Sequence, residues 1–366
     1  MKIAIVLNTS WNIYNFRSGL VRSFLEHGHD VYAISPIDQY TEKVRALGCH
    51  HIPVRMDSRG ANPVKDILLV AELYRIYKKI RPDIVLHYTI KPNIYGTLAT
   101  AALGIPSINN VCGLGTMFLK DNLVSRVAIL LYRLAFLFPK RVFFQNEDDL
   151  QLFLSKKMVK QQLCDLVPGS GIDLEKFAPH GDTGNRTFTF LLISRLIYDK
   201  GILEYIKAVE KLRSRGINAR FQLLGAVDEK HKRGIPKKLI DDWANRRIVD
   251  YLGTTEDVIP YLREADCVVL PSYREGTPKT LLEAASLGKP LVATDVPGCR
   301  NVVDDGFNGF LCEARNPDDL AEKLEKMYRL EEETRQQMGI NSRQKIENTF
   351  DEKFVIRKYH EVIQVN

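Results

Sequence analysis

Hydrophobic and polar residues alternate along the chain in two kinds of pattern. Short apolar runs rich in β-branched residues predict strands, and the amphipathic stretches between them predict helices. In the N-terminal half the predicted strands cover residues 2–7, 31–35, 50–54, 83–87, 106–109, 141–144 and 162–167. The predicted helices cover about 16–27, 38–47, 64–80, 92–103, 123–138 and 147–157. This alternation indicates parallel βαβ units, with helices on both faces of one sheet.

The alternation stops over residues 168–186, which contain four glycines and two prolines and therefore predict an interdomain connection. It resumes with strands at 188–193, 219–224, 248–252, 267–270 and 291–294 and with helices at about 200–214 and 278–287. Residues 317–364 are helical in pattern, with a break near 348–349. We expect an α/β protein of two doubly wound domains, 1–170 and 171–345, followed by a C-terminal helix in 346–366. Ligands of such sheets bind at the carboxyl ends of the strands, here in a cleft between the domains.

The composition agrees with two folded domains. The chain has 366 residues, of which 45% are hydrophobic and 27% charged, which excludes disordered and fibrous classes. Residues 1–165 contain 21 basic and 13 acidic side chains, whereas residues 166–366 contain 31 and 32. The positive excess therefore lies in the N-terminal half, as is typical of a surface that faces an anionic membrane or a polyanion, although solubility alone would also explain it.

The cysteines and the apolar runs bear on localisation. Six cysteines without a C-x-x-C pair predict reduced, buried thiols. The apolar run at residues 3–7 is too short for a signal peptide, and the longest apolar region, 127–138, is too short to span a bilayer. We expect a cytoplasmic protein that is not integral to the membrane.

Residues 271–284 follow a predicted strand and open a helix. Thr277 is a plausible N-cap, and Pro278 suits the first helical position. The amides of residues 279–281 would then form a phosphate site at the helix N-terminus. Glu275 and Glu283 would repel a phosphate but can accept hydrogen bonds from sugar hydroxyls. A capped helix with two surface glutamates would leave the same pattern.

A second motif, residues 194–201, follows the predicted strand 188–193. Arg195 and Lys200 would lie at the carboxyl end of that strand, where a fork-shaped guanidinium and a lysine are suited to a diphosphate. Taken alone, the motif is equally typical of two solvated basic residues in a loop.

Together these residues resemble the retaining family 4 glycosyltransferases. The resemblance rests on E-x7-E at Glu275 and Glu283, on S-R-L-x3-K-G at 194–201, on Leu224-Gly225, on Gly171-Ile172-Asp173 with Phe177, and on the element at 304–311. It covers nearly the whole chain in the correct order. It implies the glycosyltransferase B architecture, in which two Rossmann-like domains face each other and the last helix, here 351–364, crosses back to the first domain.

The resemblance also implies roles. Glu283 would bind the ribose of a nucleotide, Glu275 the transferred sugar, and Arg195 and Lys200 the departing diphosphate. The other donor contacts expected are Gly276, Thr277, Thr280, Leu281, Gly225, Asn15 and Arg17. Because the chain contains no D-x-D, we expect no metal ion and no cofactor beyond a UDP-sugar substrate.

The first predicted βα loop, residues 8–19, lacks the Gly-Gly pair of many relatives. Its I-Y-x-F-R string, with Val111-Cys112-Gly113-Leu114-Gly115, resembles a bacterial branch that adds N-acetylhexosamines to undecaprenyl-diphosphate-linked sugars. Many family members have a histidine where this chain has Cys112, so the role of that histidine cannot be assigned to Cys112. Candidate acceptor contacts are His87, Lys91, Asn109, Asn110 and Cys112, although His87 could equally be a half-buried polar residue.

The predicted helix 123–138 is apolar nearly all round. Arg126 and Arg133 lie seven residues apart on it, and Lys140 and Arg141 follow it. It could be a core helix with two solvated arginines. We favour an interfacial helix whose arginines meet lipid headgroups.

The hypothesis that accounts for most of these features is a retaining transferase. It would move an N-acetylhexosamine, GalNAc or GlcNAc, from a UDP-sugar to a polyprenyl-diphosphate-linked saccharide at the inner face of the cytoplasmic membrane. Retention of the anomeric configuration would give an α-linkage. The leaving phosphate would accept the proton of the acceptor hydroxyl. The alternatives are a transferase with a soluble acceptor, a UDP-sugar epimerase on the same fold, and a sugar-binding protein without activity. Nucleic acid is not an expected partner.

Overall fold

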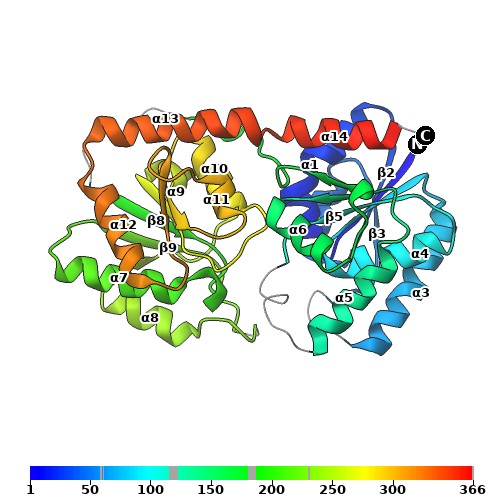
Figure 1. The fold of residues 1–366 in the computed structure, drawn as a ribbon, viewed down its shortest axis with the longest axis horizontal. Coiled ribbons are helices and arrows are strands. Elements are labelled where there is room, and N and C mark those ends of the chain that lie inside the picture. Colours follow the sequence, from blue (N-terminus) through cyan, green and yellow to red (C-terminus); the bar gives the residue numbers. More distant parts are fainter. Residues whose placement is uncertain (58–59, 61, 115–122, 180–186, 230, 365–366) are drawn as a thin grey trace. The chain divides into compact units, whose positions relative to one another are not determined.

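The computed structural model describes residues 1–57, 60, 62–114, 123–179, 187–229 and 231–364. The chain forms two compact units (Figure 1). Unit 1 consists of Met1–Ser170 together with Glu352–Asn366, and unit 2 of Gly171–Asp351. Unit 2 therefore extends six residues beyond the predicted boundary at 345.

The predicted connection at 168–186 is too long. Ile172 and Phe177 are buried in the core of unit 2, and the Ile172 amide donates to the carbonyl of Phe350 at 2.8 Å. Gly181 and Gly184, which contributed to the prediction, lie outside the described residues. The chain thus enters the core of unit 2 immediately after Ser170.

Unit 1 contains a sheet of seven parallel strands in the order β3-β2-β1-β4-β5-β6-β7. The strands are β1 (Lys2–Val6), β2 (Asp30–Ser35), β3 (His50–Pro53), β4 (Ile84–Tyr88), β5 (Ser107–Val111), β6 (Arg141–Phe144) and β7 (Cys164–Leu166). The central strands β4 and β5 are buried along their whole length, as parallel strands covered on both faces must be.

Helices cover both faces of this sheet. Its helices are α1 (Ser10–Glu26), α2 (Thr41–Arg45), α3 (Pro63–Ile80), the π-helix η1 (Pro92–Gly96), α4 (Thr97–Ala101), α5 (Leu123–Ala135), α6 (Glu147–Ser155) and α14 (Glu352–Gln364), with a short 3-10 turn at Gln161–Leu163. Apolar residues of α1 and α14 form one buried cluster with the sheet, and those of α3 to α6 form two on its other face.

The first helix begins six residues earlier than predicted. The Thr9 hydroxyl accepts a hydrogen bond from the Asn12 amide at 3.1 Å, which caps α1, and Asp38 in the next βα connection accepts one from the Ser10 amide at 2.8 Å. Asn15 and Arg17 therefore lie on a helix, and the predicted loop over 8–19 is wrong from Ser10 onward.

Unit 2 contains six parallel strands in the order β10-β9-β8-β11-β12-β13. They are β8 (Thr189–Ile193), β9 (Arg220–Leu224), β10 (Asp250–Tyr251), β11 (Cys267–Leu270), β12 (Leu291–Thr294) and β13 (Gly309–Cys312). The helices are the 3-10 turn η4 (Tyr198–Lys200), α7 (Ile202–Ser214), α8 (Lys237–Asn245), α9 (Ile259–Glu264), α10 (Lys279–Ser286), α11 (Cys299–Val302), α12 (Pro317–Arg329) and α13 (Glu332–Thr349). The sequence pattern did not predict α8, α9, α11 or β13, and the C-terminal helices break at 330–331 and 350–351.

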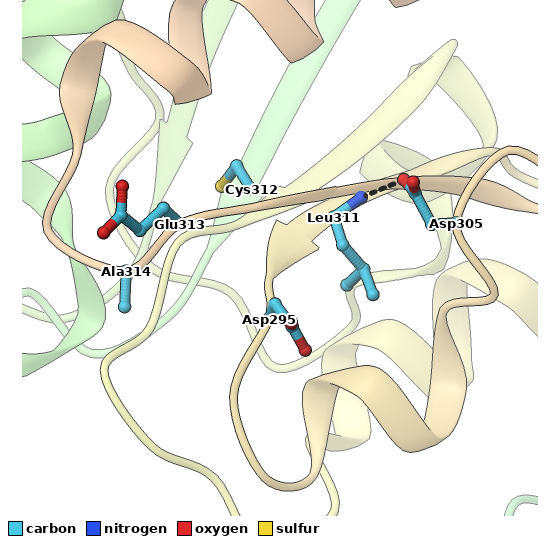
Figure 2. Close-up of a pocket in the computed structure, with 6 residues that line it drawn as sticks. All are labelled: Asp295, Asp305, Leu311, Cys312, Glu313 and Ala314. Carbon is cyan, nitrogen blue, oxygen red and sulfur yellow. Dashed lines mark hydrogen bonds between the residues drawn. The ribbon is translucent and has the colours of Figure 1, made fainter.

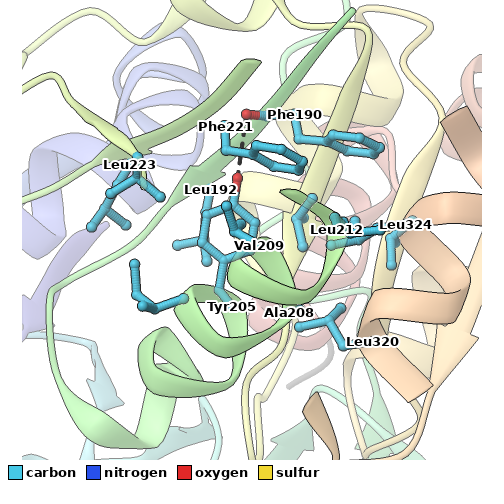
Figure 3. Close-up of a cluster of buried hydrophobic side chains, with 14 of the residues drawn as sticks. Phe190, Leu192, Tyr205, Ala208, Val209, Leu212, Phe221, Leu223, Leu320 and Leu324 are labelled. Atoms are coloured by element: carbon cyan, nitrogen blue, oxygen red, sulfur yellow. Dashed lines mark hydrogen bonds between the residues drawn. The ribbon is translucent and has the colours of Figure 1, made fainter. Parts of the chain in front are cut away.

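The core of unit 2 on the face covered by α7 and α12 combines aliphatic side chains with stacked aromatic rings (Figure 3). The rings of Phe190 and Phe221, on the adjacent strands β8 and β9, stack with centroids 5.4 Å apart. The Tyr205 hydroxyl donates to the Phe190 carbonyl at 3.4 Å, which satisfies a polar group in this buried setting. Helices α9, α10 and α11 contribute to the cluster on the opposite face.

Both sheets reverse their direction of winding once. In unit 1 the reversal lies between β1 and β4, and in unit 2 between β8 and β11, because the chain leaves these strands toward opposite edges of the sheet. The loops at the carboxyl ends of such a pair diverge and leave a crevice, which is where open α/β sheets bind their ligands. The fold thus predicts one ligand-binding edge in each unit.

Helix α14 completes unit 1, although it follows unit 2 in the sequence. Val355, Tyr359 and Ile363 are buried in the same cluster as α1 and β4. The Tyr359 ring packs edge-on against Phe143, with centroids 4.9 Å apart, and its hydroxyl accepts a hydrogen bond from Asn110 at 3.0 Å. The six cysteines are free, four of them buried. No helix in the described parts of the chain is long and apolar enough to cross a membrane.

We expect Tyr359→Ala to destabilise unit 1 by about 3–5 kcal/mol, because it leaves a cavity and removes the partner of the Asn110 amide. Urea denaturation followed by circular dichroism measures the change. The matched control is Glu361→Ala on the exposed face of α14. Equal midpoints for the two variants would show that the ring of Tyr359 does not hold this helix in place.

Candidate active site

The predicted motifs of unit 2 meet where the winding of its sheet reverses. Lys200 ends η4, which follows β8, and Glu275 lies in the loop after β11. The Lys200 ammonium and the Glu275 carboxylate form an ion pair, with side chains 19% and 13% exposed. The two loops, 75 residues apart in sequence, are therefore joined through one mostly buried pair of charges.

Two glycines allow the backbones around this ion pair to approach closely. Gly201 has φ +70°, and a Cβ there would overlap the carbonyl oxygen of Pro271. Gly298 has φ +84°, and its Cβ would overlap the carbonyl of Gly276. The Glu275 amide donates to Pro297 at 3.2 Å. The loops after β8, β11 and β12 thus pack against one another by main-chain contact, which fixes Lys200 and Glu275.

Helix α10 begins one residue later than predicted. Pro278 occupies the N-cap position and Lys279 is the first helical residue, so Thr277 is not the cap. The Leu281 amide donates to the Pro278 carbonyl at 3.0 Å and is therefore occupied, which corrects its assignment to a phosphate. The Thr280 hydroxyl donates to the Ile193 carbonyl at 3.3 Å. This bond ties the start of α10 to the end of β8.

The second carboxylate, Glu283, lies one turn into α10 and is 8% exposed. Burial raises its pKa, against the opposing attraction of Lys279 and Lys176. The Lys279 ammonium lies 3.8 Å from the nearer Glu283 oxygen. Glu283 and Glu275 therefore have different cationic partners. A buried carboxylate of this kind accepts hydrogen bonds from hydroxyl groups.

The other predicted residues of unit 2 lie at the same edge of the sheet. Arg195 is exposed in the loop between β8 and η4. Its carbonyl accepts a hydrogen bond from the Ile197 amide at 2.9 Å, while its guanidinium has no ion pair or hydrogen bond with the described residues. Gly225 directly follows β9, and its amide donates to Gly253 at 2.8 Å. Gly276 and Thr277 lie between β11 and α10. Basic groups, a helix start and two carboxylates are thus gathered at the carboxyl ends of β8 and β11.

Sequence reasoning missed the contacts that hold the Lys200 loop. Arg233 forms an ion pair with Asp199 at 2.9 Å, and the Tyr273 amide donates to the Asp199 carbonyl at 2.9 Å. The Tyr273 hydroxyl in turn donates to Glu204 at 2.8 Å. These partners come from distant segments, and their spacing in the sequence carries no signal of the contact.

A pocket of about 550 Å³ lies at the carboxyl ends of β12 and β13 (Figure 2). Its lining residues are Asp295, Asp305, Leu311, Cys312, Glu313 and Ala314. The Leu311 amide donates to Asp305 at 2.8 Å, and Asp295 pairs with Arg300 at 2.8 Å. With three carboxylates and no basic side chain in its lining, this pocket repels a diphosphate. The Lys200 edge is therefore the better anion site of unit 2.

The structure does not support His87 as an acceptor contact. Its side chain is fully buried at the end of β4, with Nε2 3.0 Å from the Tyr77 hydroxyl and Nδ1 3.4 Å from that of Thr97. Burial lowers the pKa of His87 to about 3, although a hydrogen bond with Asn109 acts in the opposite direction. His87 is a neutral, fully buried core residue, rather than the acceptor contact or the half-buried polar residue that the sequence suggested.

Asn109, Asn110 and Lys91 also serve the framework of unit 1, because their polar groups are bound within the protein. Asn109 is fully buried and donates to the Thr97 hydroxyl at 2.7 Å. Asn110 is equally buried and bonds Tyr359. The Lys91 ammonium pairs with Asp66 at 2.8 Å.

Cys112 and Arg17 are in contact. Cys112 is half-buried after β5, and the Arg17 guanidinium donates to its sulfur at 3.7 Å. Arg17 itself is buried on α1, whereas the half-buried Asn15 donates to the Trp11 carbonyl of the same helix at 3.0 Å. Gly115 of the predicted motif lies outside the described residues.

Helix α5 is two-faced. Ser125, Ala128, Tyr132 and Ala135 are buried against the unit, while Leu123, Val124, Val127, Leu130 and Leu134 are exposed. Arg126 is exposed, but Arg133 donates to the Lys156 carbonyl at 2.8 Å and Arg141 to the Gln162 carbonyl at 3.2 Å. Lys140 is half-buried. The exposed face of α5 therefore carries these apolar side chains together with Arg126 and Arg133, and the Arg133 guanidinium is already bound to the Lys156 carbonyl.

The two units define a two-domain α/β protein with a parallel sheet in each unit, an architecture shared with solved glycosyltransferases. Anabaena HepE, solved with UDP and glucose, superposes with a TM-score of 0.82 over the full length of both chains at 17% identity. Sucrose-phosphate synthase from Thermosynechococcus elongatus superposes with a TM-score of 0.81, covering 99% of this chain and 98% of that one at 16% identity. These likenesses confirm the predicted glycosyltransferase B fold.

Two family models match the chain. The model described as Glycosyl transferase 4-like matches residues 2–146, and Glycosyl transferases group 1 matches residues 175–345. The chain therefore consists of a glycosyl transferase 4-like domain and a glycosyl transferases group 1 domain, as the sequence motifs indicated.

Two curated relatives are similar over most of their length. N,N'-diacetylbacillosaminyl-diphospho-undecaprenol alpha-1,3-N-acetylgalactosaminyltransferase of Campylobacter jejuni is 28% identical, over 98% of this chain and 97% of that protein. UDP-Gal:alpha-D-GlcNAc-diphosphoundecaprenol alpha-1,3-galactosyltransferase of Escherichia coli is 26% identical, over 80% and 78%.

The buried His87 predicts a pH dependence of stability. Its pKa is depressed to about 3 in the folded state, so between about pH 6.5 and 3 the unfolded chain binds a proton that the folded chain does not. Stability should therefore fall on acidification, by about 1.4 kcal/mol per pH unit from this group. Urea unfolding at pH 7, 6 and 5 should show a smaller slope for His87→Asn than for wild type. His50→Asn at an exposed position is the control, and an unchanged slope in His87→Asn would refute the assignment.

Proposed function

We propose that this chain transfers a hexose, specifically an N-acetylhexosamine, from a UDP-sugar to a saccharide linked to polyprenyl diphosphate. The observation that carries the proposal is the Lys200–Glu275 pair beside the start of α10, at the ligand-binding edge of unit 2. The acceptor class is supported by the names of the relatives from C. jejuni and E. coli, both of which act on diphospho-undecaprenol-linked sugars.

In this proposal unit 2 binds the donor. Lys200 and the exposed Arg195 neutralise the diphosphate as it leaves, and the N-terminus of α10 adds its dipole. Because these groups supply the positive charge, we propose a reaction that needs no metal ion. Glu283 accepts hydrogen bonds from the ribose hydroxyls. Glu275 accepts them from the transferred sugar and holds Lys200 in position before the donor binds.

We extend the proposal to retention of the anomeric configuration. The bond from the anomeric carbon to the phosphate oxygen breaks, and the bond to the acceptor hydroxyl oxygen forms on the same face of the sugar. The hydroxyl proton passes to the departing phosphate oxygen. The ion pair with Lys200 supports this route, because a carboxylate held by a cation is a weaker nucleophile and is better suited to hydrogen bonding.

Lys200→Met and Glu275→Gln should each lower kcat by about 10²–10³-fold, because each removes a group aimed at the reacting diphosphate or sugar. Transfer is measured with radiolabelled UDP-GalNAc, UDP-GlcNAc and UDP-Gal and with undecaprenyl-diphosphate-linked monosaccharides, in the presence of EDTA. The double variant should lose less than the product of the two effects, because the residues act as a pair. Lys237→Met, which breaks the exposed ion pair with Asp241, is the matched control.

Three outcomes would contradict parts of the proposal. Full activity in either variant would exclude this pair from the site. Activity that appears only after Mg²⁺ or Mn²⁺ is added would exclude the metal-independent route. Conversion of the UDP-sugar without any acceptor would indicate an epimerase.

We also propose that unit 1 docks on the anionic inner face of the cytoplasmic membrane. The apolar docking surface consists of the exposed residues Val64, Ile67 and Leu68 of α3 and Leu123, Val124, Val127, Leu130 and Leu134 of α5. Both helices pack against η1, so their exposed residues belong to one side of unit 1. A lipid surface suits these residues, because the half of the chain that carries them also carries the positive excess.

The replacement of Leu130 and Leu134 together by Glu should reduce flotation of the purified protein with phosphatidylglycerol-containing vesicles by at least fivefold, because charged side chains do not enter the apolar layer. The matched control is Ile340→Glu, an exposed apolar residue on α13 of unit 2. Flotation of the α5 variant at the wild-type level would show that this surface does not bind the membrane. An equal loss of flotation in both variants would show that membrane binding is not specific to this surface.

A further inference from the structure

Arg17 is a buried cation without an anionic partner. Its side chain is 4% exposed, in the second turn of α1. The guanidinium stacks over the Tyr88 ring, 4.3 Å from the centroid, and Nη2 lies 3.7 Å from the Cys112 sulfur. Among the described residues no carboxylate pairs with it, and its buried Nε donates to no acceptor. Within the described parts of the chain, an aromatic face and a sulfur are therefore the groups that compensate the positive charge of this side chain.

The neighbouring groups do not supply the missing negative charge. Burial raises the pKa of the Cys112 thiol, although the guanidinium acts in the opposite direction, and burial likewise raises the pKa of Tyr88. All are neutral near pH 7. A guanidinium removed from water without a counter-charge is unfavourable, and a methionine would fill the same space without that penalty. An arginine here is explained if an anion pairs with it in a bound state.

The position of Arg17 is that of a ligand site. Tyr88 is the last residue of β4 and Arg17 lies on the helix that follows β1, so the guanidinium is at the point where the sheet of unit 1 reverses its winding. Cys112 and Gly113 are only half-buried, so the guanidinium lies just beneath the surface at this edge. The docking surface on α3 and α5 is separate from it, because Arg17 packs on the face of the sheet covered by α1 and α14.

Thr89 provides a second, independent observation. This β-branched residue follows Tyr88 and has φ +64°, a left-handed conformation that is unfavourable for threonine. Its hydroxyl is buried and makes no hydrogen bond to any residue that the structure describes. Strained residues with unused polar groups are concentrated at ligand sites, where the surrounding fold holds them in place for binding. The Thr89 hydroxyl is a hydrogen-bond donor available to the same anion.

We propose that Arg17, assisted by the hydroxyl of Thr89, binds a diphosphate at the carboxyl edge of the sheet in unit 1. This inference rests on the proposed function, which supplies two sources of that group: the diphosphate of the polyprenyl-linked acceptor and that of the UDP-sugar donor. A fork-shaped guanidinium in a site of low polarity binds such oxyanions through two parallel hydrogen bonds. The acidic pocket at β12 and β13 has no comparable group.

The test uses the full chain and measures binding by calorimetry. The probes are farnesyl diphosphate in detergent as the lipid diphosphate, farnesol as its uncharged counterpart, and UDP. Arg17→Met removes the charge with little change in volume, Arg17→Lys keeps the charge without the fork, and Thr89→Val removes only the hydroxyl. Arg22→Met, at an exposed position of the same helix, is the matched control.

We expect Arg17→Met to weaken farnesyl diphosphate binding at least tenfold, with smaller losses for Arg17→Lys and Thr89→Val and no change in farnesol or UDP binding. A loss of UDP binding instead would assign the site to the donor's diphosphate. Unchanged affinity for both diphosphates in Arg17→Met would overturn the proposal and leave Arg17 as a packing residue.

Thermal unfolding separates binding from folding. Without ligand, Arg17→Met should melt at or above the wild-type temperature, because it removes an uncompensated buried charge. Farnesyl diphosphate should raise the melting temperature of wild type and of Arg22→Met but not that of Arg17→Met. The site would be refuted if Arg17→Met were strongly destabilised and farnesyl diphosphate did not change the melting temperature of wild type. The inference and the proposed function can fail separately. If the diphosphate affinity depends on Arg17 but the protein transfers no sugar, only the proposed function is refuted. If the protein transfers sugar and Arg17→Met binds the diphosphates as tightly as wild type does, only the inference is refuted.

Discussion

Every strand within each of the two sheets runs parallel to its neighbours, and this constraint determines where chemistry is possible. A parallel strand can be reached only by a crossover, so helices cover both faces and every strand ends at the same edge of its sheet. Apolar runs of four or five residues suffice for such strands because the helices bury them completely. The faces of each sheet are thereby covered by helices, and the charged groups of the candidate site lie on the loops at one edge. Lys200, Glu275 and Thr280 all occupy that edge in unit 2.

The two units handle positive charge at their ligand edges in different ways. In unit 2 the Lys200 ammonium is already paired with Glu275, so an incoming diphosphate would exchange one partner for another. In unit 1 the partners of the Arg17 guanidinium, among the residues that the structure describes, are the Tyr88 ring and the Cys112 sulfur. A paired cation is held in a defined geometry before the ligand arrives. An unpaired buried cation instead gains more electrostatic energy when an anion binds, because no counter-charge in the free protein already interacts with it.

The sequence was most informative where a motif directly follows a strand. The placement of Lys200 and Glu275 at one edge could be predicted, because the position of a residue after an apolar run determines its end of a parallel sheet. Three kinds of feature were out of reach. The start of α1 depends on Asp38, which caps it from another loop, and the burial of His87 depends on Tyr77 and Thr97. Strand β13 begins with glycine, which weakens a strand pattern. The first two depend on contacts between distant segments, which no local periodicity records, and the third depends on a residue that is untypical of strands.

Unit 1 is built from two pieces of chain that are separated by all of unit 2. During synthesis on the ribosome, the first 170 residues emerge before the helix that carries Val355, Tyr359 and Ile363 has been made. Until then the apolar residues beneath α14, Phe143 among them, have no cover. The unit that begins to form first is therefore the one that is finished last. A nascent chain in this interval exposes a hydrophobic groove on unit 1, and molecular chaperones bind surfaces of that kind.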